Sequence, residues 1–339
     1  MLTPAPVPIA VPALTPVLLN LCLIGAALWG APNVEEPVVA LALGVLVAGF
    51  AQLLFQVPAL AGVGLVPRPR WAPRHEGVRR IMLLMVPALF GVSVSQINLL
   101  LDTVLASLLP TGSVSWLYYS DRLTELPLGV FAIAIATVIL PTLSGQRARA
   151  DDPAFSSTLA WAIRCVLLIA IPATVALAIL AEPLLATLFQ YGAFSEGDRT
   201  MAAASLRAYT LGLGAFMLVK VLAPGFYARE DMRTPVRIGI IAMVANMLLN
   251  AAFVFPLMWW LNLGHVGLAL ATSVSAWLNA MLLYRGLRRG AVLPADSLPL
   301  KWLLQILLAT AAMIGALAWM LPENAVWADW LWWQRAYQL

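Results

Sequence analysis

The chain has 339 residues, of which 62% are hydrophobic and only 11% are charged, and its mean hydropathy is +0.89. Soluble globular domains carry roughly 25% charged residues, so this composition excludes a soluble protein. The net charge of +4 comes from basic residues that flank apolar stretches, so it indicates membrane topology and excludes nucleic-acid binding.

Nine apolar segments follow one another along the chain, and each is long enough to cross a bilayer, which takes about 20 residues. Backbone polar groups must be satisfied within a segment in lipid, and continuous apolar runs do not suit barrel strands, which alternate. The sequence therefore predicts an all-α integral membrane protein. The predicted helices are Ala10–Trp29, Val38–Val57, Ile81–Leu108, Val114–Leu143, Leu159–Leu180, Met201–Leu222, Val236–Leu257, His265–Tyr284 and Lys301–Leu321.

The basic residues lie almost entirely in one set of alternate loops. This set holds 14 of the 20 Lys and Arg residues, from Arg68 to Lys301, whereas the other loops hold only Arg199 and Arg335. Cytoplasmic loops carry the excess of Lys and Arg. We therefore predict that the first helix runs outward and that the chain ends outside after nine spans.

A weak internal repeat relates the first two predicted helices to the seventh and eighth. Repeated halves are typical of secondary transporters, whose site lies between the halves. The third to sixth helices have no counterpart ahead of residue 10, so we expect the chain to be a fragment, or to begin too late, with four helices absent. The matching triplets, at offsets between 227 and 230, are residues 18–20 with 248–250, 41–43 with 268–270, and 53–55 with 282–284.

Arg122 is the basic residue placed deepest within a predicted helix. It lies roughly 13 Å from the outer loop at about 1.5 Å per residue, and Pro127 and Gly129 are expected to break the helix just beyond it. A guanidinium in a wet cavity suits phosphate, whose oxygens it binds in a bidentate manner. Alternatively, Asp121 or Glu125 pairs with Arg122 in a structural bridge. All three are candidate substrate-binding residues.

The other basic residues within predicted helices have simpler interpretations. Arg164 and Lys220 lie near cytoplasmic ends, where long side chains snorkel to the interface. For Arg207 a structural ion pair and a site remain equal alternatives. His75 and His265 flank spans and are expected at the interface.

A second polar group is spread over three predicted helices. Ser95, Asn98 and Asp102 share one helix face because they are spaced by three and four residues; we assign Ser95 and Asn98 to the substrate cavity. Asp102, Asn250 and Thr272 each lie roughly 10 Å from an outer helix end. Oxygen ligands at one depth suit a hard cation such as Na⁺, and interhelical hydrogen bonding is the alternative. The candidate metal ligands are Asp102, Asn246, Asn250 and Thr272.

Nothing in the sequence indicates an enzyme. The only adjacent carboxylates, Asp151 and Asp152, lie in a short loop beside basic residues, which indicates a solvated turn. Cys22 and Cys165 lie within apolar stretches and are expected to be small buried hydrophobes. No cofactor is predicted, apart from Na⁺ as a coupling ion.

Several ordered motifs resemble the MurJ/MviN family, over nearly the whole chain. Residues 9–20 resemble the fifth helix of that family, and Arg122 matches an arginine in the cavity of its eighth helix. The other motifs are Gly91–Asn98, Ser115–Glu125, Phe189–Phe194, and Lys220–Tyr227 followed by Thr234 and Pro235.

The resemblance implies a fold and a function. The family consists of lipid II flippases of the multidrug/oligosaccharidyl-lipid/polysaccharide exporter superfamily, MATE-like bundles of two lobes with about fourteen helices in the bacterial inner membrane. The resemblance assigns residues 1–60 to the last two helices of an incomplete N-lobe. It assigns residues 61–290 to a six-helix C-lobe and 291–339 to a further helix and a truncated tail. This chain then holds helices 5–13.

The implied activity is transport of lipid II by alternating access. Its diphosphate is the group that cavity arginines hold, and a fragment without the first helices is expected to be inactive alone. Two other functions remain open: a flippase for another polyprenyl-linked glycan, and a cation-coupled multidrug antiporter of the same superfamily. Arg122 favours an anionic substrate over the cationic drugs of an antiporter.

The predicted topology can be tested by labelling single cysteines in intact cells, with Cys22 and Cys165 replaced by alanine. Cysteines within residues 65–74 or at Arg288 should be protected from a membrane-impermeant thiol reagent, whereas those at Asn33 or Gly112 should react, because only the latter are predicted outside. The opposite labelling pattern would reverse the orientation.

Overall fold

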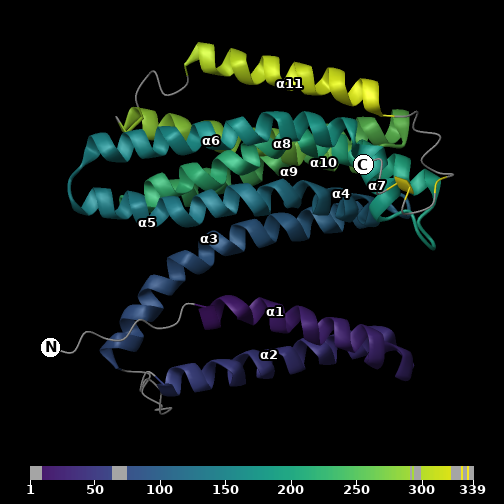
Figure 1. Cartoon of the computed structure of the whole chain (residues 1–339), viewed down its shortest axis with the longest axis horizontal. Coiled ribbons are helices and arrows are strands. Elements are labelled where there is room, and N and C mark those ends of the chain that lie inside the picture. The colour runs from purple at the N-terminus through teal and green to yellow at the C-terminus, as the bar shows by residue number, and fades with distance from the viewer. Residues whose placement is uncertain are drawn as a thin grey trace. The chain divides into compact units, whose positions relative to one another are not determined.

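The protein is described by a computed structural model, in which every regular element of the described residues is helical (Figure 1). These residues are 10–62, 75–290, 292–293, 299–321, 330 and 334–335. They divide into two compact units, Met1–Arg79 and Arg80–Leu339. Within them, eight helices are long and apolar enough to cross a membrane. Helix α3 (Glu76–Ser107), whose side chains are only partly described, covers the third predicted span. The all-α membrane prediction is confirmed.

The first unit contains a helical hairpin. Helix α1 (Ala10–Gly25) continues through a π-helical turn, η1 (Ala26–Gly30), and a short 3-10 turn, η2 (Ala31–Asn33), and then packs against α2 (Pro37–Gly62). Small residues on α2 make the contact: Ala40, Gly44 and Ala48 recur every four positions and are buried. Such stripes let helix backbones approach closely in membranes.

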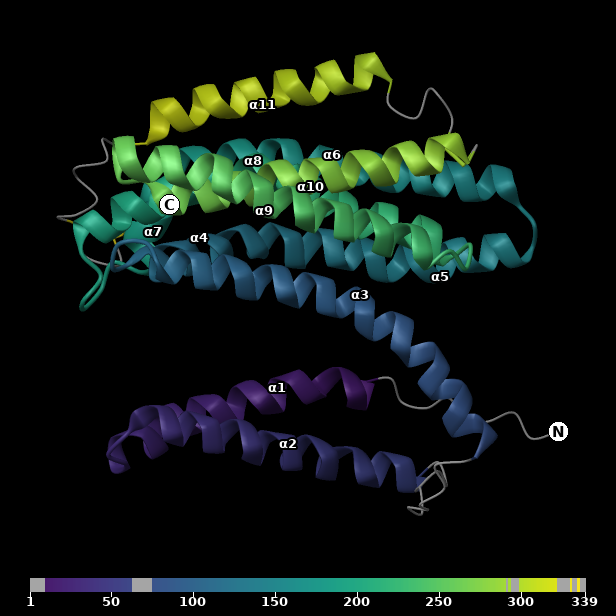
Figure 2. The ribbon, with the colours of Figure 1, turned by 180° about the vertical axis from the view of Figure 1, so that it is seen from behind.

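The second unit is a bundle around helix α8 (Figure 2). Helix α8 packs against α4, α5, α6, α7 and α10, while α9 packs mainly on α10, and α11 on α6. The elements after α3 are α4 (Ser113–Pro127), η3 (Leu128–Ile133), α5 (Ala134–Ala148), α6 (Asp152–Ile179), α7 (Ala181–Leu188), α8 (Glu196–Tyr227), α9 (Arg233–Leu261), α10 (Gly264–Arg289) and α11 (Leu300–Met320).

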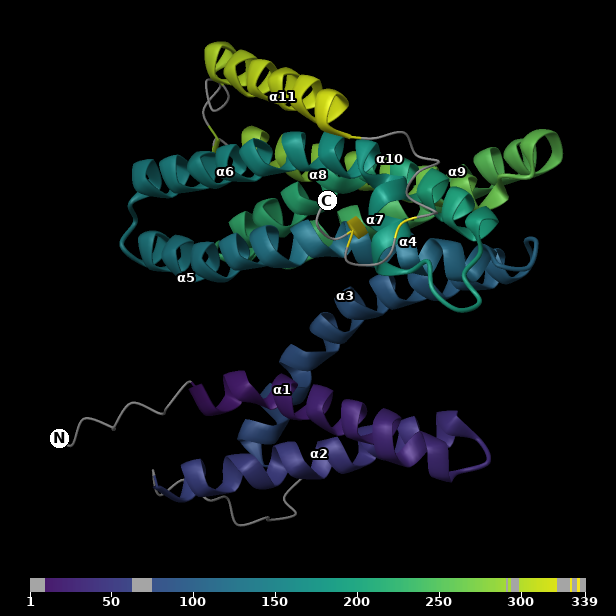
Figure 3. The same ribbon diagram turned by 45° about the vertical axis from the view of Figure 1, so that its right-hand side comes forward.

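The loops of this unit separate by charge. The segments after α5, α8 and α10 carry or adjoin the clustered arginines, and we call their end of the bundle the basic end. The α5–α6 loop there lies opposite the end that holds α7 (Figure 3). Asp151 caps α6 by accepting a hydrogen bond from the N–H of Ala154 at 3.0 Å, and Asp152 pairs with Arg147 at 3.1 Å. Asp151 is therefore the N-cap of α6 and Asp152 its first residue, and both lie at the exposed start of the helix.

Two local predictions are wrong. The chain does not break at Pro127 and Gly129, because α4 continues through the π-helical segment η3 into α5 as a single span. A π-helical turn accommodates the proline without ending the helix. His265 is 1% exposed and packs edge-on against Trp116, with ring centroids 4.8 Å apart. It is thus buried within the unit and not exposed at the interface.

Helix α9 and α10 approach so closely that a side chain is excluded at Gly267. A Cβ there would lie 2.9 Å from backbone atoms of Phe253 and Val254. Gly212 on α8 has the same role against α10, since its Cβ would lie 2.7 Å from the Cα of Ser273. These contacts fix the three helices that carry much of the cavity described below.

We expect Gly267→Ala to destabilise the protein by about 1–3 kcal/mol, because a methyl group would force the two backbones apart. The measurement is the thermal midpoint in detergent. Gly145→Ala is the matched control, since nothing lies within 4 Å of a Cβ at Gly145 and alanine favours the helix. Equal midpoints for the two variants would contradict the close-packing account.

Candidate functional site

The second unit contains a cavity of about 740 Å³, lined by residues of α3, α4, η3, α8, α9 and α10. Cavities of this size between helices of a bundle are typical binding sites. Charge inside a membrane bundle normally faces such a cavity or a partner. Among the described residues, the charged ones that line it are Asp102, Asp121, Arg122, Glu125 and Lys220.

Arg122 projects into this cavity from α4. Its Nη1 lies 2.6 Å from Oε2 of Glu125, and the two side chains are 51% and 48% exposed. Its Cζ lies 4.8 Å from the ring centroid of Tyr118. Of the two predicted partners of Arg122, Asp121 and Glu125, the structure shows an ion pair with Glu125. An exposed pair contributes only about 0–1 kcal/mol, which leaves the guanidinium available to a competing anion.

The opposite face of α4 is fixed to α8 and to the loop between α7 and α8. The indole N–H of Trp116 donates to Oδ1 of Asp198 at 2.7 Å, and the hydroxyl of Ser120 lies 2.7 Å from the carbonyl oxygen of Ala202. Tyr119 packs against Phe189 and Phe194, with ring centroids 4.7 and 5.2 Å away. Because these contacts set the rotation of α4, Asp121, Arg122 and Glu125 face the cavity.

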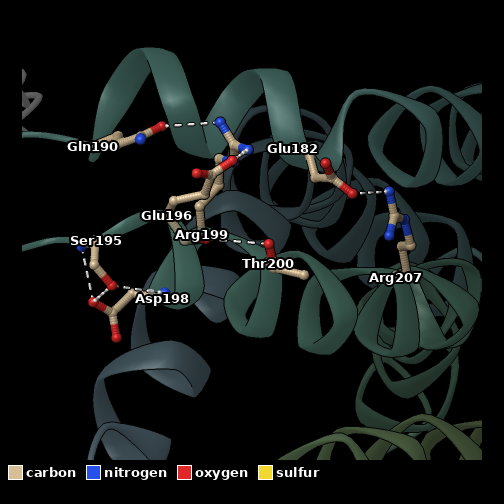
Figure 4. Close-up of polar contacts among 8 residues, drawn as sticks. All are labelled: Glu182, Gln190, Ser195, Glu196, Asp198, Arg199, Thr200 and Arg207. Atoms are coloured by element: carbon tan, nitrogen blue, oxygen red, sulfur yellow. Dashed lines mark hydrogen bonds and ion pairs between the residues drawn. The ribbon is translucent and has the colours of Figure 1, made fainter. Parts of the chain in front are cut away.

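The outer part of this support is a set of polar contacts around the start of α8 (Figure 4). Ser195 and Asp198 form a capping box, which satisfies the free N–H groups of the first turn. Arg199, 4% exposed, pairs with Glu196 at 2.8 Å. Arg207 pairs with Glu182 of α7 at 2.9 Å and does not line the cavity. For Arg207 the geometry thus favours the structural ion pair.

The predicted cation ligands come together on α3, α9 and α10. The Nδ2 of Asn250 donates to Oδ1 of Asp102 at 2.8 Å and lies 3.1 Å from Oδ1 of Asn246. The Nδ2 of Asn246 lies 3.4 Å from Oγ1 of Thr272. Asn98, assigned from sequence to the substrate cavity, lines it and also donates to Oδ2 of Asp102 at 3.2 Å. The side chain of Ser95 lies outside the described residues.

This cluster has unused acceptor capacity. The buried Oδ1 of Asn250 has no hydrogen-bond partner, although buried polar atoms are nearly always paired. With its amide turned, Asn246 donates to Asn98 and Asp102 at 3.1 and 3.3 Å, so its polar atoms suit two arrangements. One carboxylate with neutral oxygens suits a monovalent hard cation. The described residues contain no group of three or more His, Cys, Asp or Glu that would hold a transition metal.

Lys220, for which the sequence favoured snorkelling, lines the cavity. The spacing of Tyr209, Phe216 and Lys220 by seven and four residues was the available indication, because residues so spaced share a helix face. Arg164, by contrast, donates from Nε to the carbonyl oxygen of Ala160 at 3.3 Å and does not line the cavity.

Comparison with known proteins identifies the family. A family model described as lipid II flippase MurJ matches residues 9–331. The chain belongs to this family. A relative from Vibrio cholerae named "Probable lipid II flippase MurJ" is 51% identical over 97% of this chain and 62% of its own length. One from Burkholderia cenocepacia named "Lipid II flippase MurJ" is 42% identical over 91% and 60%. The chain thus spans about three-fifths of the relatives it matches.

Solved structures agree with the family assignment. A structure named "Lipid II flippase MurJ, inward closed conformation" superposes with a TM-score of 0.74 at 25% identity, covering 96% of this chain and 64% of that one. A MATE structure in complex with MaL6 superposes with a TM-score of 0.63 at 14% identity, over 83% of this chain and 62% of that one. The latter shows a shared fold alone. The chain is a multi-pass protein of the bacterial inner membrane with a MATE-like helical bundle.

Proposed function

We propose that the protein takes part in moving lipid II across the bacterial inner membrane by alternating access, without making or breaking a covalent bond. Arg122, a permanent cation inside a cavity, carries this proposal. Lipid II joins a polyprenyl tail to a disaccharide with its peptide through a diphosphate, whose oxygens a guanidinium binds in a bidentate manner. The names of the relatives support the same substrate.

The geometry around Arg122 suggests how the substrate is held. Glu125 neutralises Arg122 in the structure, with Nη1 and Oε2 2.6 Å apart. A diphosphate that enters would compete for the guanidinium and displace the carboxylate. Glu125 and Asp121 would then be the groups that neutralise Arg122 whenever no substrate is bound. Without them, the guanidinium would be a charge without a partner inside the membrane.

The two alternative functions receive less support. A multidrug antiporter would favour an acidic, apolar cavity without a central arginine, and the MATE likeness extends only to the fold. A different polyprenyl-linked glycan would share the diphosphate and the tail. The two substrates would differ only in the sugar and peptide, so only competition by the sugar and peptide of lipid II would distinguish them.

We also propose that Na⁺ binds among Asp102, Asn246, Asn250 and Thr272 as the coupling ion. The unpartnered, buried Oδ1 of Asn250 supports this proposal. The cluster lines the same cavity as Arg122 through Asp102, Asn246 and Thr272. Occupation by a cation would replace hydrogen bonds between α3, α9 and α10 with ion contacts, and would thereby influence the shape of the cavity.

The substrate proposal predicts that Arg122→Ala weakens lipid II binding to the chain in nanodiscs by about 10- to 100-fold, because a hydrogen bond to a charged group contributes about 1.5–3 kcal/mol. Arg122→Lys should retain part of the affinity, since it keeps the charge and loses the bidentate geometry. Arg149→Ala is the matched control, because Arg149 is exposed and does not line the cavity.

The structural alternative predicts a different result. If Arg122 only neutralises its neighbours, Arg122→Ala would lower the amount of folded protein, and a second change, Glu125→Gln or Asp121→Asn, would restore both folding and binding. Rescue by such a double variant would refute the substrate role. Lost binding at normal abundance, unrepaired by the second change, would support it.

The cation proposal predicts a higher thermal midpoint in Na⁺ than in choline. At a Na⁺ concentration 100 times the Kd, bound Na⁺ should stabilise the folded protein by about 2.7 kcal/mol. Asp102→Asn should remove this gain, and Thr272→Val should reduce it. Asp121→Asn is the control, because Asp121 lines the cavity outside the cluster. Stability that ignores Na⁺ in the wild type and in all variants would leave interhelical hydrogen bonding as the role of the cluster.

A further inference from the structure

Among the described residues that line the cavity, Lys220 differs from the other cation, Arg122, in having no ion-pair partner. It is exposed and lines the cavity, and the described residues offer it no ion pair. Arg122, by contrast, is paired with Glu125 and has Asp121 beside it. Among the described lining residues, Lys220 is therefore the cation that an incoming anion meets without displacing a carboxylate.

The helix register places Lys220 far from Arg122. Trp116 contacts Asp198 and Ser120 contacts Ala202, and both pairs are 82 residues apart, so α4 and α8 run parallel at a constant offset. That offset brings Arg122 level with Ala204. Lys220 lies a further roughly 24 Å along α8 at about 1.5 Å per residue, close to the basic end. One diphosphate group, a few ångströms long, cannot touch both.

Two further residues complete the surroundings of Lys220. Contacts between Gly212 and Ser273, and between Gly225 and Leu287, place Asn279 of α10 within roughly 5 Å, or about one turn, of the level of Lys220. Asn279 lines the cavity, and its side chain makes no hydrogen bond to the described residues. Its carboxamide is thus free to donate.

The third wall of this region is open. Gly239 of α9 lines the cavity, and nothing lies within 4 Å of a Cβ built on it. The antiparallel register of α9 and α10, fixed where Asn246 meets Thr272, carries Gly239 close to the level of Asn279. An ammonium, a free amide and open space thus occur at one depth, and the described acidic lining residues, Asp102, Asp121 and Glu125, all lie towards the opposite end.

We propose that Lys220 and Asn279 form a second anion-binding subsite, which holds the diphosphate of an isoprenoid-linked substrate near the basic end before it reaches Arg122. The subsite rests on the proposed function for its place in transport. Lysine binds phosphate as a point charge and lacks the planar fork of arginine. It therefore suits a first, weakly oriented contact from which the group is readily released.

The test measures binding of farnesyl diphosphate, an isoprenoid diphosphate without sugar, to the chain in nanodiscs. We expect Lys220→Ala to raise the Kd about tenfold and Lys220→Arg to stay within about threefold of the wild type. Gly239→Leu should also weaken binding, because its side chain would fill the open space beside the subsite. Lys301→Ala is the control, since Lys301 is an exposed lysine that does not line the cavity.

The variants separate two subsites from one. If there are two, Lys220→Ala and Arg122→Ala should each leave residual binding, and the double variant should abolish it. Unchanged affinity in Lys220→Ala and Gly239→Leu, with binding abolished by Arg122→Ala alone, would overturn the proposal. Competition by inorganic diphosphate at similar concentrations would support a subsite that recognises the head group alone; weak competition would support one that also requires the isoprenoid.

Lipid II binding distinguishes failure of the subsite from failure of the proposed function. If the wild type binds lipid II and Lys220→Ala changes nothing, the subsite is refuted and the function stands. If farnesyl diphosphate binds in a manner that depends on Lys220 while lipid II does not bind, the subsite stands and the lipid II proposal falls.

Discussion

The contacts that hold α8 at the centre of the second unit are the constraint on which its cavity depends. Lipid supplies no hydrophobic drive between helices, so close packing and interhelical hydrogen bonds must fix their positions. Trp116 and Ser120 fix α4 to α8, and Ser273 donates to the carbonyl oxygen of Ala208 at 2.8 Å to fix α10. Because α8 positions both α4 and α10, the charged residues on the walls of the cavity lie at fixed distances from one another.

Charge in this cavity is graded along its length. Among the described lining residues, three carboxylates and the paired Arg122 lie towards the end that holds α7, and Lys220 lies towards the basic end. An anionic group could therefore bind weakly at Lys220, whereas at Arg122 it would have to displace the carboxylate of Glu125. Na⁺ bound in the proposed cluster would add a positive charge to the acidic part, so ion and substrate occupancy would influence each other electrostatically.

The spans could be predicted because hydropathy over about 20 residues reports membrane insertion directly, and the meeting of Asp102, Asn250 and Thr272 followed from their equal depth. Side-chain direction could not be predicted in the same way. Lys220 lies at a depth where both snorkelling and a cavity are consistent with the sequence. Asn98 lines the cavity and also donates to Asp102, because residues four apart on a helix are neighbours.

The π-helical segment η3 has a consequence for the whole α4–α5 span. Buried positions on α4 include Ser120, Thr124 and Pro127, and an uninterrupted α-helix would continue this stripe near residue 131. The buried residues that follow are Ala132, Ile139 and Leu143, one position later. The wider π-helical turn thus adds one residue, and the buried stripe continues one position later in the sequence. It keeps the buried residues of both halves on one side of a single helix, whose first half also presents Arg122 to the cavity.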